Sequence, residues 1–334
     1  MPQLTGKRAH TCLCHLRFVM GKRLLPHGVY APLPVFFNDS DELDLEAYVR
    51  HAVYVAKPGV IPVISATMGE AAHLDREERT RLIKATRSAL DDNGLRQTPI
   101  VAGVGAPSTR ETIALAKDAA AAGADFVLVI APGYFAAALR ARPGAVKRFF
   151  VDVAGESPVP VVIYNYPLIA GGIDLSSDDV VDIATAAPNV CGVMLACGNV
   201  GKVSRITTLL PESFKTIAGF IDFLLPSVIV GSAGVISPLP NLVPDFAMSF
   251  WRSTQNLDTA TDRTRARRLQ EKASLAEAEM LTGGVAGLKY LLNEKFGYPA
   301  APRLPLLPLD EDAAARLSGG KHLQALLEEQ KTMK

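Results

Sequence analysis

The chain has 334 residues, 49% of them hydrophobic, and a formal net charge of +1. This length supports a sizeable buried core. The near-neutral charge gives no electrostatic reason to expect nucleic acid or an anionic membrane as a partner. No apolar run reaches the roughly 18 residues that a membrane helix needs, so we also expect no membrane-spanning segment.

The first 27 residues are basic and poor in acid. The basic residues there are Lys7, Arg8, Arg17, Lys22 and Arg23, and the first acidic residue of the chain is Asp39. We expect residues 1–27 to form a basic extension without fixed structure. A transit segment for mitochondrial import has the same composition, and a later start at Met20 is a further alternative.

The cysteines do not suggest a disulfide framework. Cys12 and Cys14 lie in the basic extension, whereas Cys191 and Cys197 lie close to one predicted strand. This usage favours a reducing compartment, and we expect a cytoplasmic location. Two histidines stand near Cys12 and Cys14, but their spacing fits none of the usual zinc patterns, so no metal site is expected.

Short apolar runs alternate with amphipathic segments from Gly28 onward. The runs have four to six residues each, as buried parallel strands should. They lie at 29–33, 61–66, 100–103, 126–130, 159–164, 190–195, 214–218 and 233–237, with helical segments at 44–56, 76–90, 108–122, 145–153 and 177–186. This alternation predicts an α/β fold, a (β/α)8 TIM barrel over residues 28–240.

The pattern changes after the eighth predicted strand. Residues 242–294 are almost wholly helical in character, and residues 310–329 read as one more helix after a proline-rich connector at 302–308. We therefore expect a C-terminal helical extension over residues 241–334. The charge run at 262–268 is typical of a solvated helix face.

Chemistry in such a barrel belongs at the carboxyl ends of the strands. The second strand ends in Ser65-Ala66-Thr67-Met68-Gly69-Glu70, where hydroxyl and N–H groups could bind a carboxylate or an oxyanion; an ordinary turn explains it equally well. The fifth strand ends at Tyr164, whose phenol could relay a proton or simply line the mouth. The glycines after the third strand lack the spacing of a dinucleotide site, so no cofactor is expected.

Two further strand ends hold residues that are unremarkable in isolation. The sixth strand ends at Met194, which alone would be core filler. Small residues run from Gly231 to Ser237 in the eighth strand, where backbone must approach a ligand or a neighbour closely.

Together these segments resemble the dihydrodipicolinate synthase and N-acetylneuraminate lyase family of class I aldolases. Residues 65–70 are similar to the family's Gly-Thr-Thr-Gly-Glu element, and residues 164–167 to its Tyr-Asn-x-Pro element. The resemblance covers residues 28–298. Residues 28–32, 197–202 and 287–290 are most similar to fungal 2-keto-3-deoxy-sugar-acid aldolases of the L-threo-3-deoxy-hexulosonate type.

The resemblance implies a role for each matching position. A sixth-strand lysine would form an imine with a 2-keto acid, and Tyr164 would transfer protons with help from Thr67. Tyr134, after the fourth strand, would complete the relay across a subunit interface, which implies a homotetramer or homodimer. The substrate carboxylate would rest on the backbone near Thr67 and Met68.

Three positions depart from the family pattern, each replacing a polar group by an apolar one. Met194 stands at the lysine position, and a thioether cannot form an imine. Met68 replaces a second threonine, and Ile169 replaces an arginine that dihydrodipicolinate synthases use. We expect a more apolar pocket, whose substrate-binding residues are Met68, Met194, Ile169, Gly219 and Ile236.

These departures leave three functional readings. The first is a diverged lyase that acts on a carbonyl or 2-keto-acid-like compound without an imine, as a tailoring step in specialised metabolism. The second is a non-catalytic binding or regulatory barrel. The third is an ordinary 2-keto-3-deoxy-sugar-acid aldolase with an inactivating lysine-to-methionine change. Lys202 and Lys289 are not expected to point into the barrel and replace the lost amine.

Overall fold

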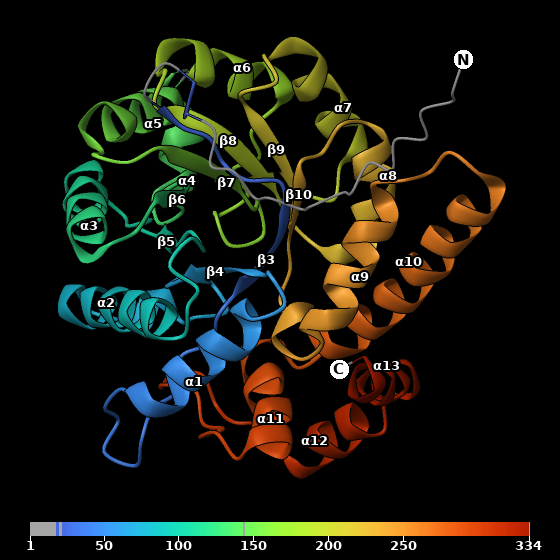
Figure 1. The fold of residues 1–334 in the computed structure, drawn as a ribbon. Helices are drawn as coiled ribbons and strands as arrows, with labels where there is room; N and C mark the ends of the chain where they lie inside the picture. Colours follow the sequence, from blue (N-terminus) through green and yellow to red (C-terminus); the bar gives the residue numbers. More distant parts are fainter. Residues whose placement is uncertain (1–17, 20–21, 143, 334) are drawn as a thin grey trace, which may run out of the picture.

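The structure, a computed structural model, describes residues 18–19, 22–142 and 144–333. Within these residues eight parallel strands close into a barrel in the order β10-β3-β4-β5-β6-β7-β8-β9 (Figure 1). The strands are β3 (Gly28–Pro32), β4 (Ile61–Ile64), β5 (Val101–Gly103), β6 (Phe126–Ile130), β7 (Val161–Asn165), β8 (Val190–Leu195), β9 (Lys215–Ala218) and β10 (Gly234–Ile236). The predicted TIM barrel is confirmed, and each strand overlaps the run that predicted it.

Side chains alternate between the barrel lumen and the surrounding helices, as the two-residue period of a strand requires. On β7, Val162 and Tyr164 belong to the lumen cluster, whereas Val161 and Ile163 pack outward. The lumen cluster groups the buried hydrophobic side chains that face the barrel interior. Its buried members are Leu25, Tyr30, Ile61, Val63, Ala66, Val101, Phe126, Leu128, Val162, Tyr164, Met194, Ala196, Ile217, Ala233 and Ile236.

Helices between the strands cover the outside of the barrel. They are α1 (Leu45–Ala56), α2 (Arg76–Asp92), α3 (Thr109–Ala122), α4 (Ala136–Arg140), α5 (Ala145–Glu156), α6 (Ser177–Ala186), α7 (Val200–Leu209) and α8 (Leu224–Ile229). Short 3-10 turns follow β4 (η1, Ala71–His73), β9 (η2, Ile221–Phe223) and β10 (η3, Leu239–Asn241). Helix α2 begins with a reciprocal capping box between Asp75 and Glu78, which fixes where the chain leaves the turn after β4.

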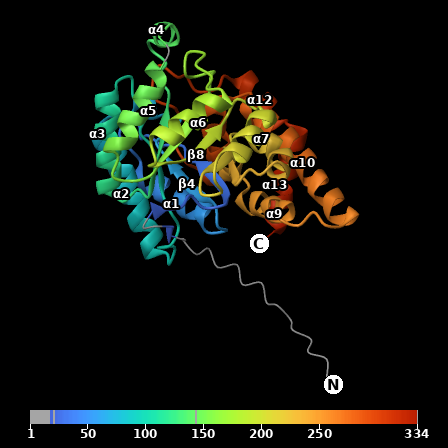
Figure 2. The same ribbon diagram turned by 90° about the horizontal axis from the view of Figure 1, so that it is seen from above.

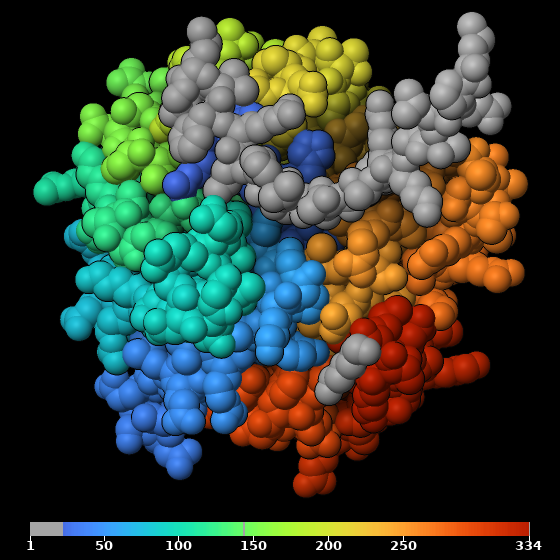
Figure 3. Space-filling view, in the orientation of Figure 1, coloured from blue at the N-terminus to red at the C-terminus, as the bar shows by residue number. Residues whose placement is uncertain are grey.

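The C-terminal helices gather on one side of the barrel, beside α1 (Figures 2 and 3). They are α9 (Pro244–Thr254), α10 (Ala260–Leu281), α11 (Gly284–Phe296), α12 (Glu311–Ser318) and α13 (Lys321–Thr332). The single helix expected over 310–329 is wrong, because the chain breaks at Gly319 and Gly320. A Cβ on Gly320 would lie 2.8 Å from a carboxylate oxygen of Glu279 in α10. The absence of a side chain at this break therefore allows the start of α13 to pack closely against α10.

The chain before β3 is only partly described. Strands β1 (Phe18–Val19) and β2 (Lys22–Arg23) pair antiparallel, and Leu25, 2% exposed, already belongs to the lumen cluster. Cys12 and Cys14 lie outside the described residues, and Cys191 and Cys197 are free thiols. Among the described residues no helix is both long and apolar enough to cross a membrane.

Candidate active site

Met194 lies inside the barrel next to Tyr164. The two residues are partners in the register of β7 and β8, and both belong to the lumen cluster. Their exposed fractions are 5% and 8%. A thioether therefore occupies the place in the lumen where the resemblance puts the imine-forming lysine, and it is shielded from solvent.

The buried hydroxyl of Tyr164 has a polar neighbour, the side chain of Thr67. Its hydroxyl lies 3.3 Å from Oγ1 of Thr67, within hydrogen-bonding distance across the mouth between β7 and the turn after β4. Burial raises the pKa of Tyr164, and the hydrogen bond from Thr67 opposes this rise only in part. The phenol is therefore protonated at neutral pH and can act as a hydrogen-bond donor or a general acid.

The turn that carries Thr67 has an unusual backbone. Ser65 and Glu70, at its two ends, adopt left-handed conformations with φ of 53° and 50°. Such conformations cost a non-glycine residue roughly 1–3 kcal/mol each and persist only where surrounding contacts enforce them. Observed outliers of this kind cluster at functional sites, so the turn is a good candidate for a binding element.

The same turn leaves two backbone donors available. The N–H groups of Gly69 and Glu70 donate to the carbonyls of Ala66 and Thr67 and so close the turn. Within the described part of the chain, the N–H groups of Thr67 and Met68 have no hydrogen-bond partner. Consecutive free N–H groups can receive a carboxylate or an oxyanion.

Aromatic and aliphatic side chains lie close to Tyr164 and Met194. The ring of Tyr166 lies 5.8 Å from that of Tyr164 and 6.0 Å from that of Phe220, which follows β9. Ile236, one of the predicted substrate-binding residues, is 3% exposed in the lumen cluster. A Cβ on Gly219 would lie 2.3 Å from Cα of Ala196, so Gly219 lets the ends of β8 and β9 approach closely.

Three predicted site residues lie outside this group in the single chain. Tyr134 is 82% exposed on the loop after β6, where its ring contacts that of Phe135. Ile169 is 42% exposed on the loop after β7. Met68 is partly buried and packs against the outer core rather than the lumen cluster.

Lys202 and Lys289 are both held by carboxylates. Nζ of Lys202 lies 2.5 Å from Asp174, on the segment that follows β7, and Nζ of Lys289 lies 2.8 Å from Glu70.

Sequence reasoning overlooked Lys215, which alternates along β9 with residues that pack outward and so belongs to the side of the strand that faces the lumen. It begins β9, two residues before the partner of Met194, and its charged neighbour is Glu212. It therefore lies toward the amino end of the barrel, away from Tyr164.

Sequence reasoning also missed Glu277, a fully buried carboxyl group on α10. Its oxygens accept hydrogen bonds from the hydroxyl of Ser237, directly after β10, and from the N–H of Asp222, in η2. Burial raises the pKa of Glu277 to about 8. Glu277 thus fastens the ends of the seventh and eighth strands to the C-terminal helices. One signal was available, since Glu277 shares the buried face of α10 with Ala273, Ala276 and Met280.

The described residues contain no cluster of three or more His, Cys, Asp or Glu side chains that could hold a metal ion. Burial raises the pKa of the Cys191 thiol to about 12, so this thiol is unreactive at neutral pH. The groups that the single chain brings together at this end of the barrel include the phenol of Tyr164, the hydroxyl of Thr67 and the free N–H groups of Thr67 and Met68.

Comparison with known proteins places this site in a family. The model of the dihydrodipicolinate synthetase family matches residues 25–325. The chain belongs to this family. The match spans the barrel and most of the C-terminal helices, in keeping with the family resemblance of the strand-end residues.

Similar members of the dihydrodipicolinate synthetase family come from fungi. A probable mitochondrial 4-hydroxy-2-oxoglutarate aldolase of Emericella nidulans is 42% identical over 89% of this chain and 94% of its own length. An L-threo-3-deoxy-hexylosonate aldolase of Hypocrea jecorina is 33% identical over 92% of this chain and 98% of its own. A crystal structure of a dihydrodipicolinate synthase family protein from Coccidioides immitis superimposes with a TM-score of 0.81 at 35% identity, covering 94% of this chain and all of that one.

Proposed function

We propose that the chain is a lyase that acts on a carbonyl or 2-keto-acid-like compound without forming a lysine imine. The observation that carries this proposal is the pairing of Met194 with Tyr164, since the position of the amine is filled by a thioether while the Tyr164–Thr67 contact is kept. The aldolase names of the relatives support the reaction class. A tailoring step in specialised metabolism would suit such an enzyme.

The proposed chemistry uses the groups at the mouth. The N–H groups of Thr67 and Met68 receive the substrate carboxylate or a second carbonyl oxygen. When the C–C bond beside the reacting carbonyl breaks, its electron pair passes to the carbonyl oxygen, which takes the proton of the Tyr164 hydroxyl. Thr67 relays the proton that the substrate hydroxyl loses to the Tyr164 oxygen, so that the phenol is restored and an aldehyde and an enol leave the site. General acid–base help of this kind contributes roughly 10²- to 10⁴-fold, which suits a substrate that is already reactive.

The apolar surroundings favour a substrate with an apolar chain. Met194 and Ile236 are buried in the lumen cluster, with Tyr166 and Phe220 packed against it. A sugar acid would place several hydroxyl groups against these side chains without hydrogen-bond partners, which is costly in a buried site. We therefore propose apolar carbonyl compounds or apolar 2-keto acids as substrates.

Replacing Tyr164 by phenylalanine tests the proposal. The full chain is assayed against a panel of 2-keto acids, 4-hydroxy-2-keto acids and apolar aldehydes, and turnover of the best compound is compared with that of Tyr164→Phe. We expect a fall of roughly 10²- to 10⁴-fold. Unchanged turnover in Tyr164→Phe would refute the proposal.

The loss of the amine favours one competing function, a barrel that binds a ligand without turning it over. Turnover of no compound in the panel, combined with tight binding of one of them, would establish that function instead.

The variant Met194→Lys tests the third alternative, an aldolase that a single change has inactivated. If that variant forms a borohydride-reducible adduct with pyruvate, the site is otherwise intact; if it forms none, the pocket has diverged further.

We further propose that a second copy of the chain completes the mouth. Tyr134, Phe135, Leu168 and Ile169 form an exposed apolar patch on the loops after β6 and β7 (the loop patch). The two loops touch, since a Cβ on Gly133 would lie 2.8 Å from the carbonyl carbon of Ala170. Large exposed apolar patches are typical of protein interfaces. A homodimer or homotetramer formed through the loop patch would bring Tyr134 of one copy to the site of another.

The location in the cell is also a proposal. Cysteine usage supports the cytoplasm, whereas the basic first 27 residues and the names of two relatives, both called mitochondrial, support import into mitochondria. Fractionation of cells that express the full chain with a C-terminal tag decides between them. Import with removal of the basic extension would yield a shorter mitochondrial form.

A further inference from the structure

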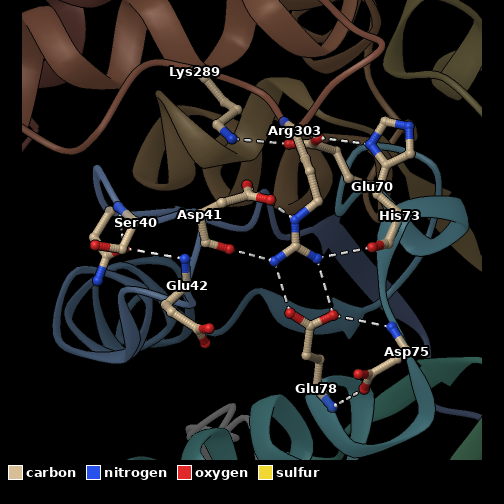
Figure 4. A network of polar contacts seen from close by, with 10 residues as sticks. Ser40, Asp41, Glu42, Glu70, His73, Asp75, Glu78, Lys289 and Arg303 are labelled. Carbon is tan, nitrogen blue, oxygen red and sulfur yellow. Dashed lines mark hydrogen bonds and ion pairs between the residues drawn. The ribbon is translucent and has the colours of Figure 1, made fainter.

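Glu70 ends the turn that carries Thr67, and its carboxylate is fully buried. One oxygen accepts a hydrogen bond from Nζ of Lys289, on α11, at 2.8 Å (Figure 4). The other accepts from the backbone N–H of Arg303 at 2.9 Å and lies 3.1 Å from Nδ1 of His73. The side chains of Glu70 and Lys289 are both 0% exposed. Two of these three partners come from the C-terminal region, more than 200 residues away in sequence.

Arg303 extends the connection to two neighbouring loops. Its guanidinium group forms a two-pronged contact with the carboxylate of Glu78, at 2.8 and 3.0 Å, and donates to the carbonyls of Asp41 and His73 (Figure 4). Arg303 and Lys289 both lie over the ring of Phe37. The C-terminal connector is therefore fastened to the loops after β3 and β4 and to the first turn of α2.

A backbone hydrogen bond links Glu70 directly to Thr67. The N–H of Glu70 donates to the carbonyl of Thr67 at 3.1 Å, so a displacement of Glu70 displaces the carbonyl of Thr67 with it. The left-handed backbone at Ser65 and Glu70 makes this turn unfavourable in isolation, and it needs contacts from outside to persist. The buried carboxylate provides those contacts.

The need for stability alone does not explain such a pair. Replacing a buried ion pair by neutral groups of similar volume is often neutral or stabilising, because the desolvation of both charges opposes their attraction. Fixing a geometry is a better explanation. We propose that Glu70 is a positioning residue, which with Lys289 and Arg303 holds the Thr67 turn so that the Thr67 hydroxyl reaches Tyr164.

The C-terminal region would then set the geometry of the mouth without touching a substrate. The catalytic meaning of this inference rests on the proposed roles of Thr67 and Tyr164. The contact itself can be tested without any turnover, so that the two proposals can fail separately.

The test measures the hydrogen bond of the Tyr164 hydroxyl by carbon NMR. The full chain is labelled with [ζ-13C]tyrosine, the Tyr164 signal is assigned as the one lost in Tyr164→Phe, and Thr67→Val gives its position without the Thr67 hydroxyl. We expect the double variant Glu70→Gln/Lys289→Met, which removes both buried charges, to shift the Tyr164 signal toward its position in Thr67→Val while its unfolding midpoint stays near that of the wild type.

Two matched variants separate positioning from general disturbance. Lys289→Arg keeps the charge and should leave the Tyr164 signal near its wild-type position. Lys272→Met/Glu329→Gln removes another ion pair of the C-terminal helices, with atoms 2.6 Å apart, and should not move the signal. A folded Glu70→Gln/Lys289→Met variant whose Tyr164 signal coincides with that of the wild type would overturn the proposal.

Discussion

The proposed function depends on Met194, because a thioether cannot form an imine. The strand that carries it was predicted correctly, because residues 190–195 form a short and mostly apolar run of the kind that buried parallel strands have. The carboxylate partner of Lys289 could not be predicted, because Glu70 and Lys289 are separated by more than 200 residues and only the fold brings them together. Local patterns carry no information about such pairs.

Glu277 leads to a prediction about pH. Its folded-state pKa of about 8 lies above the usual value of 4.5, so between these values the folded protein holds a proton that the unfolded chain has lost. The contribution of Glu277 to the free energy of unfolding therefore falls as pH rises through this window and levels off above pH 8. We expect Glu277→Gln to gain stability relative to the wild type from pH 5 to pH 8, by about 2–5 kcal/mol.

Urea unfolding at a series of pH values measures this difference. Glu271→Gln, at an exposed position on the same helix with a surface contact to Arg267, is the control and should track the wild type. Parallel curves for the wild type and Glu277→Gln across the window would mean that Glu277 titrates normally in the folded protein.

At the scale of the elements, the backbone of β5 packs closely against the turn that carries Thr67. A Cβ on Gly103 would lie 2.1 Å from the carbonyl oxygen of Ser65, a distance that no side-chain movement can relieve. Gly103→Ala should lower the free energy of unfolding by roughly 1–3 kcal/mol or more and displace Ser65, as overpacking does in tight interiors.

Gly155→Ala is the matched control for this prediction. Gly155 lies in α5, and a Cβ there would meet nothing within 4 Å. Alanine is the better helix former, so this variant should be more stable by about 0.5–1 kcal/mol. Urea unfolding of both variants tests the pair, and equal effects would show that the Ser65 contact is not restrictive.

The elements themselves were largely predictable, for identifiable reasons. Buried strands are short apolar runs, and the helix predicted to begin at Ser108 is capped by the side chain of that residue. The prediction of one helix over 310–329 did not take account of Gly319 and Gly320, which separate α12 from α13. Gly320 packs closely against Glu279 of α10. A contact between two separate helices cannot be predicted from the local sequence.

At the scale of the whole molecule, the loop patch predicts how copies assemble. Leu168 of this patch is 80% exposed, and a carboxylate there would be desolvated in an interface. We expect the wild type to be a dimer or tetramer by light scattering coupled to size-exclusion chromatography, and Leu168→Asp to shift it toward the monomer.

Leu209, 57% exposed on α7 and outside the loop patch, offers a control for this assembly. Leu209→Asp should leave the oligomeric state unchanged. A Leu168→Asp variant that keeps the mass of the wild type would place the interface elsewhere and leave Tyr134 without its proposed role. Sequence alone could not show the exposure of Tyr134, because a loop residue follows no periodic pattern.

A thioether in the lumen is open to a different kind of damage from the amine that the family resemblance would place there. An amine at that position is open to carbonyl compounds, whereas methionine is oxidised to its sulfoxide by peroxides where they can reach the sulfur. Met194 is 5% exposed beside Tyr164, whereas Met68 is only partly buried on the turn after β4. Oxidative stress should therefore reach Met68 first, and the folded barrel should protect the sulfur of Met194 until it opens.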